Sequence, residues 1–222
     1  MRAFFLTIST CLLFLYNSFS QTPDEKDSPH TDSYITISPL SFLDYYVPRL
    51  RVGYIQHLGG PWKMGVDLGL GAGTGLFSQI ESEDELLFEV RPELYYGLGK
   101  GSKTSKYISV ELFYIDDSKT ILNDGYERRD GVDILYDKAD FQRQKYGMHV
   151  KFGLFLNLGR HFGFNFYGGI GFRFKNISFE NMVNPREGIE EDLGHFFGTI
   201  YDTDKNDFRP NPSLGFKFYY RL

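Results

Sequence analysis

Hydrophobic and polar residues alternate with a period of two over long stretches of this chain. In residues 62–73 the even positions, among them Trp62 and Val66, are apolar, whereas the odd positions are Gly, Lys or Asp. The same alternation recurs in residues 88–98, 146–158, 162–174 and 214–222. Because side chains change face at every step of a strand, this pattern predicts long β-strands, each with one apolar face.

The spacing of these segments predicts the number of strands. Seven strands are expected, at about residues 46–58, 61–76, 86–98, 106–118, 142–158, 161–178 and 209–222. Their connections are alternately short, as at 59–60 and 159–160, and long, as at 119–141 and 179–208. Bacterial outer-membrane barrels have short periplasmic turns, long outer loops and an even number of strands. An eighth strand is therefore expected in residues 33–42, and the predicted fold is all-β: an eight-stranded antiparallel up-and-down transmembrane β-barrel.

The polar face combines glycines with charges of both signs. A glycine on a solvent-facing strand weakens the strand, whereas inside a narrow barrel it leaves room for long side chains. Eight strands enclose an interior that side chains fill, and buried charges persist only when they are paired. We therefore expect the apolar face to contact lipid and paired charges to fill the lumen. The residues expected in this lumen charge network are Arg49, Arg51, Asp67, Glu89, Arg91, Glu93, Glu111, Lys151, Arg173, Lys175, Lys217 and Arg221.

Aromatic residues make up 18% of the chain, and several lie near the ends of the expected strands. Tyr and Trp collect at the two interfaces of a bilayer. The candidates for such interfacial girdles are Tyr54, Trp62, Tyr96, Tyr107, Tyr146 and Tyr220.

The N-terminus has the layout of a secretory signal peptide. Arg2 precedes an apolar stretch, and small residues lead to an expected cleavage site after Ser20, so residues 1–20 are expected to be removed. The one cysteine, Cys11, lies inside this stretch, so the mature chain is expected to contain no disulfide. Residues 21–32 are expected to be a flexible lead-in, and residues 33–222 form the predicted barrel.

Charge and motif content exclude several roles. A net charge of −5 without a basic stretch argues against nucleic-acid binding. We find no nucleophile–base pair, metal-ligand set or cofactor motif, so we expect no enzyme, metal or cofactor; His149 is expected on the lumen face. The outer loops are acidic, with eight acids against two bases in residues 179–208. Two interpretations of these loops are left open: they attract divalent cations or basic partners, or they serve solubility and repel aggregation.

The C-terminal strand carries the most specific motif. Gly215, Phe218 and Tyr220 match the Gly-x-x-aromatic-x-aromatic pattern that the barrel-assembly machinery reads, although the chain ends in Leu222 rather than Phe. Over nearly the whole expected mature chain, the sequence resembles the small outer-membrane β-barrel proteins of the OmpA/OmpX type. The resemblance implies a place in the outer membrane of a Gram-negative bacterium, contact with outer-membrane lipid and assembly by that machinery.

This resemblance implies little about activity, because one fold hosts many functions. We expect a monomer with a structural or surface-interaction role, a side-chain-filled lumen and acidic extracellular loops. Three alternatives are left open. The first is a narrow channel or transporter for small solutes. The second is an outer-membrane lipid-modifying enzyme in which His149 or His195 takes part, and the third is a soluble secreted lipocalin-like binder.

Overall fold

The computed structural model describes residues 33–43, 48–72, 82–100, 103–127, 132–187 and 207–222. The expected signal peptide, residues 1–20, and lead-in, residues 21–32, lie outside these ranges. The fold described below belongs to the unit Asp32–Leu222.

The described residues form strands and one short helix. The strands are β1 (Tyr34–Ile37), β2 (Leu50–Gly59), β3 (Trp62–Ala72), β4 (Ser82–Lys100), β5 (Thr104–Glu127), β6 (Asp133–Asn157), β7 (Phe162–Val183), β8 (Arg186–Glu187) and β9 (Asp207–Arg221). A 3-10 helix, η1 (Pro39–Leu43), follows β1. Within the described residues, no helix combines the length and the apolar character that crossing a bilayer would demand.

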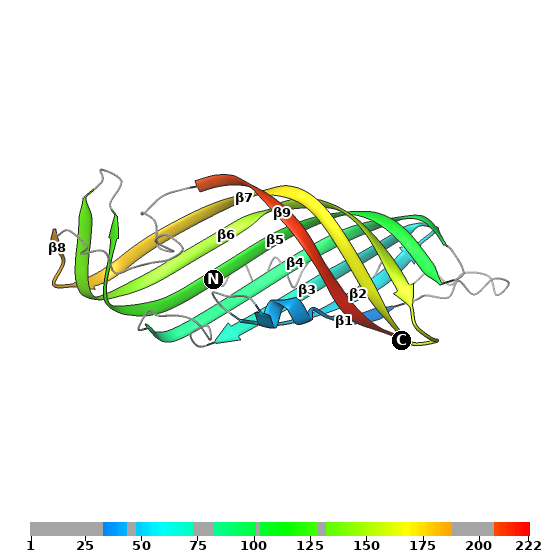
Figure 1. The fold of residues 1–222 in the computed structure, drawn as a ribbon, viewed down its shortest axis with the longest axis horizontal. Coiled ribbons are helices and arrows are strands. Elements are labelled where there is room, and N and C mark those ends of the chain that lie inside the picture. Colours follow the sequence, from blue (N-terminus) through cyan, green and yellow to red (C-terminus); the bar gives the residue numbers. More distant parts are fainter. Residues whose placement is uncertain (1–32, 44–47, 73–81, 101–102, 128–131, 188–206) are drawn as a thin grey trace, which may run out of the picture. The chain divides into compact units, whose positions relative to one another are not determined.

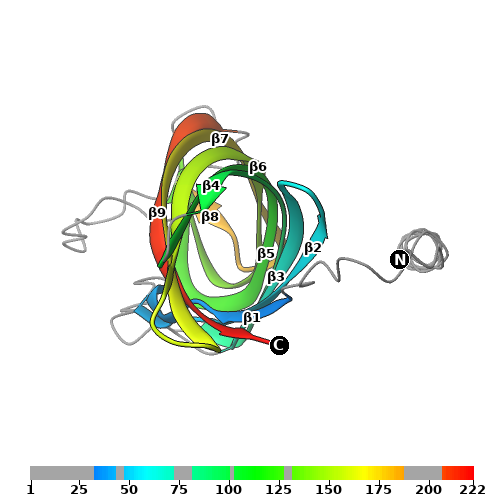
Figure 2. The same cartoon turned by 90° about the vertical axis from the view of Figure 1, so that its right-hand side faces the viewer.

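Eight of the strands close into a ring (Figures 1 and 2). The order around the ring is β5-β4-β3-β2-β1-β9-β7-β6, the pairing of β5 with β6 closes it, and the two-residue β8 adds to β6. Every pairing is antiparallel. Strands that follow one another in the chain lie side by side in the ring, and β9 pairs with β1. This confirms the prediction of an all-β, antiparallel, up-and-down fold with eight strands around a barrel-like ring.

The first strand occupies only part of the expected range. Ile35 of β1 pairs with Tyr54 of β2 on one side and with Tyr220 of β9 on the other, which joins the two ends of the chain's sheet. The strand ends at Ile37 and η1 begins at Pro39. Pro39 has no backbone N–H to donate to a neighbouring strand and a fixed φ, and it begins η1 instead of extending β1. The expected strand at 33–42 is therefore reduced to four residues.

The prediction of a long connection at residues 119–141 is wrong. β5 and β6 continue as a paired hairpin as far as Glu127 and Asp133, and β7 runs on to Val183. The expected strands were ones whose apolar face points outward. Here the alternation persists, but apolar side chains such as Ile121 and Phe141 are buried on the inside.

Candidate functional site

An apolar band surrounds the ring on its outer face. Ile170 of β7 is 76% exposed and Leu214 of β9 is 87% exposed, and similar side chains occupy the outward positions of the other strands. We define the apolar band by the outward apolar side chains of residues 35–37, 50–58, 62–70, 86–98, 108–114, 146–158, 162–174 and 208–222. An apolar face of this extent is rare on the water-facing side of a sheet.

Aromatic side chains lie near both ends of the band. Trp62 and Tyr96 pack edge to face beside the short β2–β3 turn, with ring centroids 4.9 Å apart. At the opposite end Tyr146 stacks on Phe174 at 5.4 Å. Five of the girdle candidates are exposed on the outer face: Tyr54, Trp62, Tyr96, Tyr146 and Tyr220. The sixth was wrong, because the outward positions of β5 are the even ones and Tyr107 is buried in the lumen.

The lumen holds a continuous chain of ion pairs that begins at β2 and β4. The carboxylate of Glu89 on β4 is fully buried and lies 2.7 Å from Arg49 and 2.9 Å from Arg51. Arg91, two residues further along β4, also bonds to Glu89. A second guanidinium nitrogen of Arg91, Nη1, lies 2.9 Å from Glu111 of β5. Arg91 therefore bridges two buried carboxylates.

Two buried lysines extend this chain across the lumen. Lys151 Nζ on β6 lies 2.7 Å from Glu111 and 2.9 Å from Glu93. Lys217 Nζ on β9 lies 2.6 Å from Asp67 of β3 and 3.5 Å from Glu93. None of these five residues is more than 3% exposed. Burial of a charge is costly unless the charge is paired, so the alternation of signs is what allows them to lie inside.

The structure brings nine of the twelve expected lumen charges together. This lumen network consists of the cations Arg49, Arg51, Arg91, Lys151 and Lys217 and the anions Asp67, Glu89, Glu93 and Glu111. The other three expected members lie elsewhere along the ring. Arg221 lies near the short turns, where it donates to Asn157 at 2.8 Å. Arg173 and Lys175 are half-buried on β7, towards the end of the ring opposite the short turns.

His149 lies at the edge of the lumen network. Its ring stacks on Phe113 at 4.8 Å, and its Nδ1 lies 3.0 Å from Glu111 Oε1. Its Nε2 lies 2.9 Å from the side-chain amide of Asn211. Both ring nitrogens are therefore held by polar side chains of the lumen, whereas His195 lies outside the described residues.

An aromatic cluster fills the lumen near the short turns. Its members are Tyr34, Ile55, Tyr95, Tyr107, Phe155 and Tyr219, none more than 3% exposed. Glycines on the inward positions make the space for these rings. A Cβ at Gly153 would lie 2.4 Å from the Tyr107 ring, and one at Gly163 would lie 2.3 Å from the Tyr219 ring. The inward glycines thus admit large side chains into a narrow interior.

Beyond the apolar band, the polarity of the two sheet faces is reversed. We call this region the extension: residues 82–85, 116–127, 133–144 and 176–183, with β8. Its inward side chains form an apolar cluster of Ile121, Tyr126, Ile134, Tyr136, Ala139, Phe141 and Ile177. Its outward side chains include Asp116, Ser118, Thr120, Asp140, Gln142, Ser178 and Glu180. This is the arrangement of a sheet that faces water on its outer side.

Two buried ion pairs lie at the base of the extension. Arg143 pairs with Asp117 at 2.5 Å, and Lys119 lies 3.6 Å from Glu85. Burial raises the pKa of Glu85 above its ordinary value, and the positive charge of Lys119 opposes this shift only in part. The base of the extension is therefore held by short-range pairing as well as by apolar contacts.

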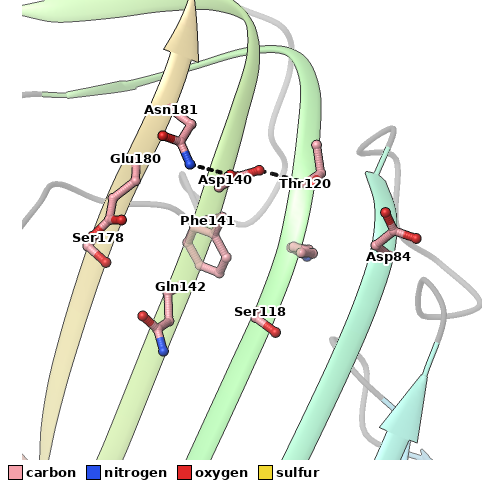
Figure 3. A pocket seen from close by; sticks show the side chains of 10 residues that line it. Asp84, Ser118, Thr120, Asp140, Phe141, Gln142, Ser178, Glu180 and Asn181 are labelled. Atoms are coloured by element: carbon pink, nitrogen blue, oxygen red, sulfur yellow. Dashed lines mark hydrogen bonds between the residues drawn. The ribbon is translucent and has the colours of Figure 1, made fainter.

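The outer face of the extension contains an open depression of about 380 Å³ (Figure 3). Its lining consists of Asp84, Ser118, Lys119, Thr120, Asp140, Phe141, Gln142, Ser178, Glu180 and Asn181. Asp140 is fixed from both sides, because Thr120 donates to one carboxylate oxygen at 3.2 Å and Asn181 donates to the other at 2.8 Å. No sequence motif indicated this depression, since its residues come from four strands.

The residues of the expected assembly signal lie on β9 and at the end of the chain. Gly215 faces the lumen, where a Cβ would lie 2.5 Å from the Tyr167 hydroxyl. Phe218, Tyr220 and Leu222 are exposed within the apolar band. In the described part of the chain, no group of three or more His, Cys, Asp or Glu side chains is arranged to hold a metal ion.

Comparisons with known proteins find little. No family model and no curated protein matches the sequence. A major outer membrane protein from Thermus thermophilus aligns over 86% of this chain and 98% of its own, with 9% identity and a TM-score of 0.43. CarO from Acinetobacter baumannii aligns over 89% of this chain and 98% of its own, with 10% identity and a TM-score of 0.36. Likenesses this weak support no inference about function, which has to come from the side chains themselves.

Proposed function

We propose that this chain is a β-barrel of the bacterial outer membrane with a structural or surface-interaction role rather than an enzymatic one. Its filled lumen holds the ring together, and the extension is displayed at the cell surface. The observation that carries the proposal is the reversal of polarity along β4–β7: apolar outside and charged inside over the band, polar outside and apolar inside over the extension. A change of surroundings from hydrocarbon to water stabilises both arrangements in one sheet.

The height of the apolar band supports this placement. The eight steps from Trp62 to Leu70 cover roughly 26 Å along β3, and the twelve steps from Leu86 to Leu98 cover roughly 40 Å along β4. Strands tilted by about 40° then span about 20–30 Å, which brackets the height of about 25 Å of the outward apolar surface in membrane barrels. A closed ring also leaves no sheet edge within the band, as a hydrocarbon environment requires.

The connections support the orientation. Residues 60–61 join β2 to β3, and residues 158–161 join β6 to β7, all at one end of the ring. The extension lies at the opposite end. Because outer-membrane barrels place their short turns in the periplasm, the extension would face the outside of the cell.

Brominated lipids test the membrane placement, since the chain has one tryptophan, Trp62. In a Trp62→Phe background, Ile170→Trp should be strongly quenched by lipids with bromine deep in the acyl chains. Ser178→Trp, on the same strand but in the extension, should be almost unquenched. Equal quenching at the two positions, or none at either, would refute the proposed placement.

Conductance separates this proposal from the channel alternative. The aromatic cluster and the lumen network leave their side chains almost without solvent exposure, so the reconstituted protein should give no current steps in planar bilayers. An open general porin reconstituted in the same lipid serves as the positive control. Reproducible steps of uniform size would favour a narrow channel instead.

A further inference from the structure

The depression on the extension is crossed by a row of polar side chains. Glu180 of β7 lies opposite Asp140 of β6, and Asp140 lies opposite Thr120 of β5. Thr120 in turn lies opposite Glu83 of β4, and the next residue, Asp84, lines the depression. Neighbouring strands are about 4.8 Å apart, so the row extends over roughly 15 Å. Figure 3 shows Glu180, Asp140, Thr120 and Asp84 along adjacent strands.

Two irregularities in the sheet aim side chains at this row. The register of β4 against β5 shifts at Asp84, which has a φ of 53°. The register of β6 against β7 shifts beside Asn181, which has a φ of 51°. β-bulges redirect side chains, and positive φ is uncommon for residues other than glycine. Both residues line the depression.

The negative charge of the lining is not compensated. The depression has three carboxylates, and its one described basic residue, Lys119, directs its ammonium group towards the buried Glu85. Asp84 and Glu180 have no hydrogen bond or ion pair within the described part of the chain, whereas Asp140 is held in place by its two neighbours. The depression is thus an open cavity with fixed acceptors and excess negative charge.

A single metal ion does not match this geometry. Among the described residues, no acidic, histidine or cysteine side chains converge in the way that a metal ion needs. The carboxylates are instead distributed from strand to strand, which suits several positive charges spaced along a flexible chain. The hydroxyl groups of Ser118 and Ser178 and the amide of Gln142 offer further acceptors for N–H groups. The volume lies at the lower end of the range of about 300–1,000 Å³ for small-molecule sites.

We propose that the depression binds a linear polyamine. Its ammonium groups pair with Asp84, Asp140 and Glu180, and its alkyl linkers lie across the strands between them. This proposal rests on the proposed function, because it names what the solvent-exposed extension binds at the cell surface.

Titration calorimetry of the full chain in detergent, with spermidine as the probe, tests the site. Exposed ion pairs are individually weak, so Asp84→Asn and Glu180→Gln should each raise the Kd by about two- to fivefold, and the double variant by roughly tenfold. Added salt should weaken the binding further, because it screens exposed charges. Absence of spermidine binding to the unaltered protein would overturn the proposal.

Asp137→Asn is the matched control. It removes the same charge from the extension, but Asp137 faces Asn184 and Arg186 and is not part of the lining, so the Kd should stay unchanged. Equal weakening by this control would mean general attraction to an acidic surface and would overturn the site. Displacement of spermidine by an equal concentration of magnesium chloride would also overturn it. Lipid quenching does not depend on spermidine, so failure of this site and failure of the membrane placement are distinguishable.

Discussion

Glu93 is the position at which the lumen network is most open to a quantitative test. Its carboxylate accepts contacts from Lys151 at 2.9 Å and Lys217 at 3.5 Å. It also accepts hydrogen bonds from Tyr95 and Ser109, each at 2.7 Å. With Glu93 in place, five cations face four anions in the lumen network, an excess of one positive charge.

Glu93→Leu should lower the free energy of unfolding by about 3–5 kcal/mol, the usual cost of removing one partner of a buried ion pair. Two ammonium groups lose a carboxylate, two buried hydroxyls lose their acceptor, and the excess positive charge rises from one to two. Lys151 keeps Glu111 and Lys217 keeps Asp67, which prevents a larger loss.

The double variant Glu93→Leu/Lys151→Met is the control for charge. It restores the native excess of one positive charge, with four cations against three anions, and leaves Lys217 on Asp67. It should therefore be more stable than the sum of the single variants predicts, by about 1–3 kcal/mol. Equilibrium urea unfolding in lipid vesicles, followed by Trp62 fluorescence, measures both values. A loss below about 1 kcal/mol for Glu93→Leu, or strict additivity in the cycle, would refute a packed and paired lumen.

Two further pairs of variants test the faces of the strands. Val110→Lys, in the apolar band of β5, should cost about 2–4 kcal/mol in vesicles, whereas Ser118→Lys, on the same face of the same strand in the extension, should change stability by less than about 0.5 kcal/mol. Similar costs at both positions would argue against a membrane boundary between them. Gly163→Ala should destabilise by about 1–3 kcal/mol, because its Cβ would overlap the Tyr219 ring. Gly159→Ala, where nothing lies within 4 Å of the added Cβ, should be close to neutral, and equal melting temperatures for the two variants would contradict the steric reasoning.

Some features of the candidate site could be read from the chain, and others could not. The alternation placed the twelve expected charges on inward positions. It could do so because successive side chains of a strand point to opposite faces, so the face of each residue follows from its position in its own strand. Which charges pair is not local: Glu89 bonds to Arg49 and Arg51, which lie 40 and 38 residues earlier in the chain. Only the cross-strand register brings them together. The depression was missed for the same reason, since its lining is gathered from four strands and shaped by two shifts of register.

The sequence by itself determined the strand type, the eight-strand count and the side of each strand that carries apolar residues. It did so because a period of two is imposed by backbone geometry and is visible within a single strand. The tertiary structure decided where the apolar side points. Val66 and Phe166 face outward, whereas Ile121 and Phe141 face inward on the same ring. Alternation alone is identical in the two cases; the closure of the ring assigns one face to the interior, and the surroundings of the other face then select apolar or polar side chains.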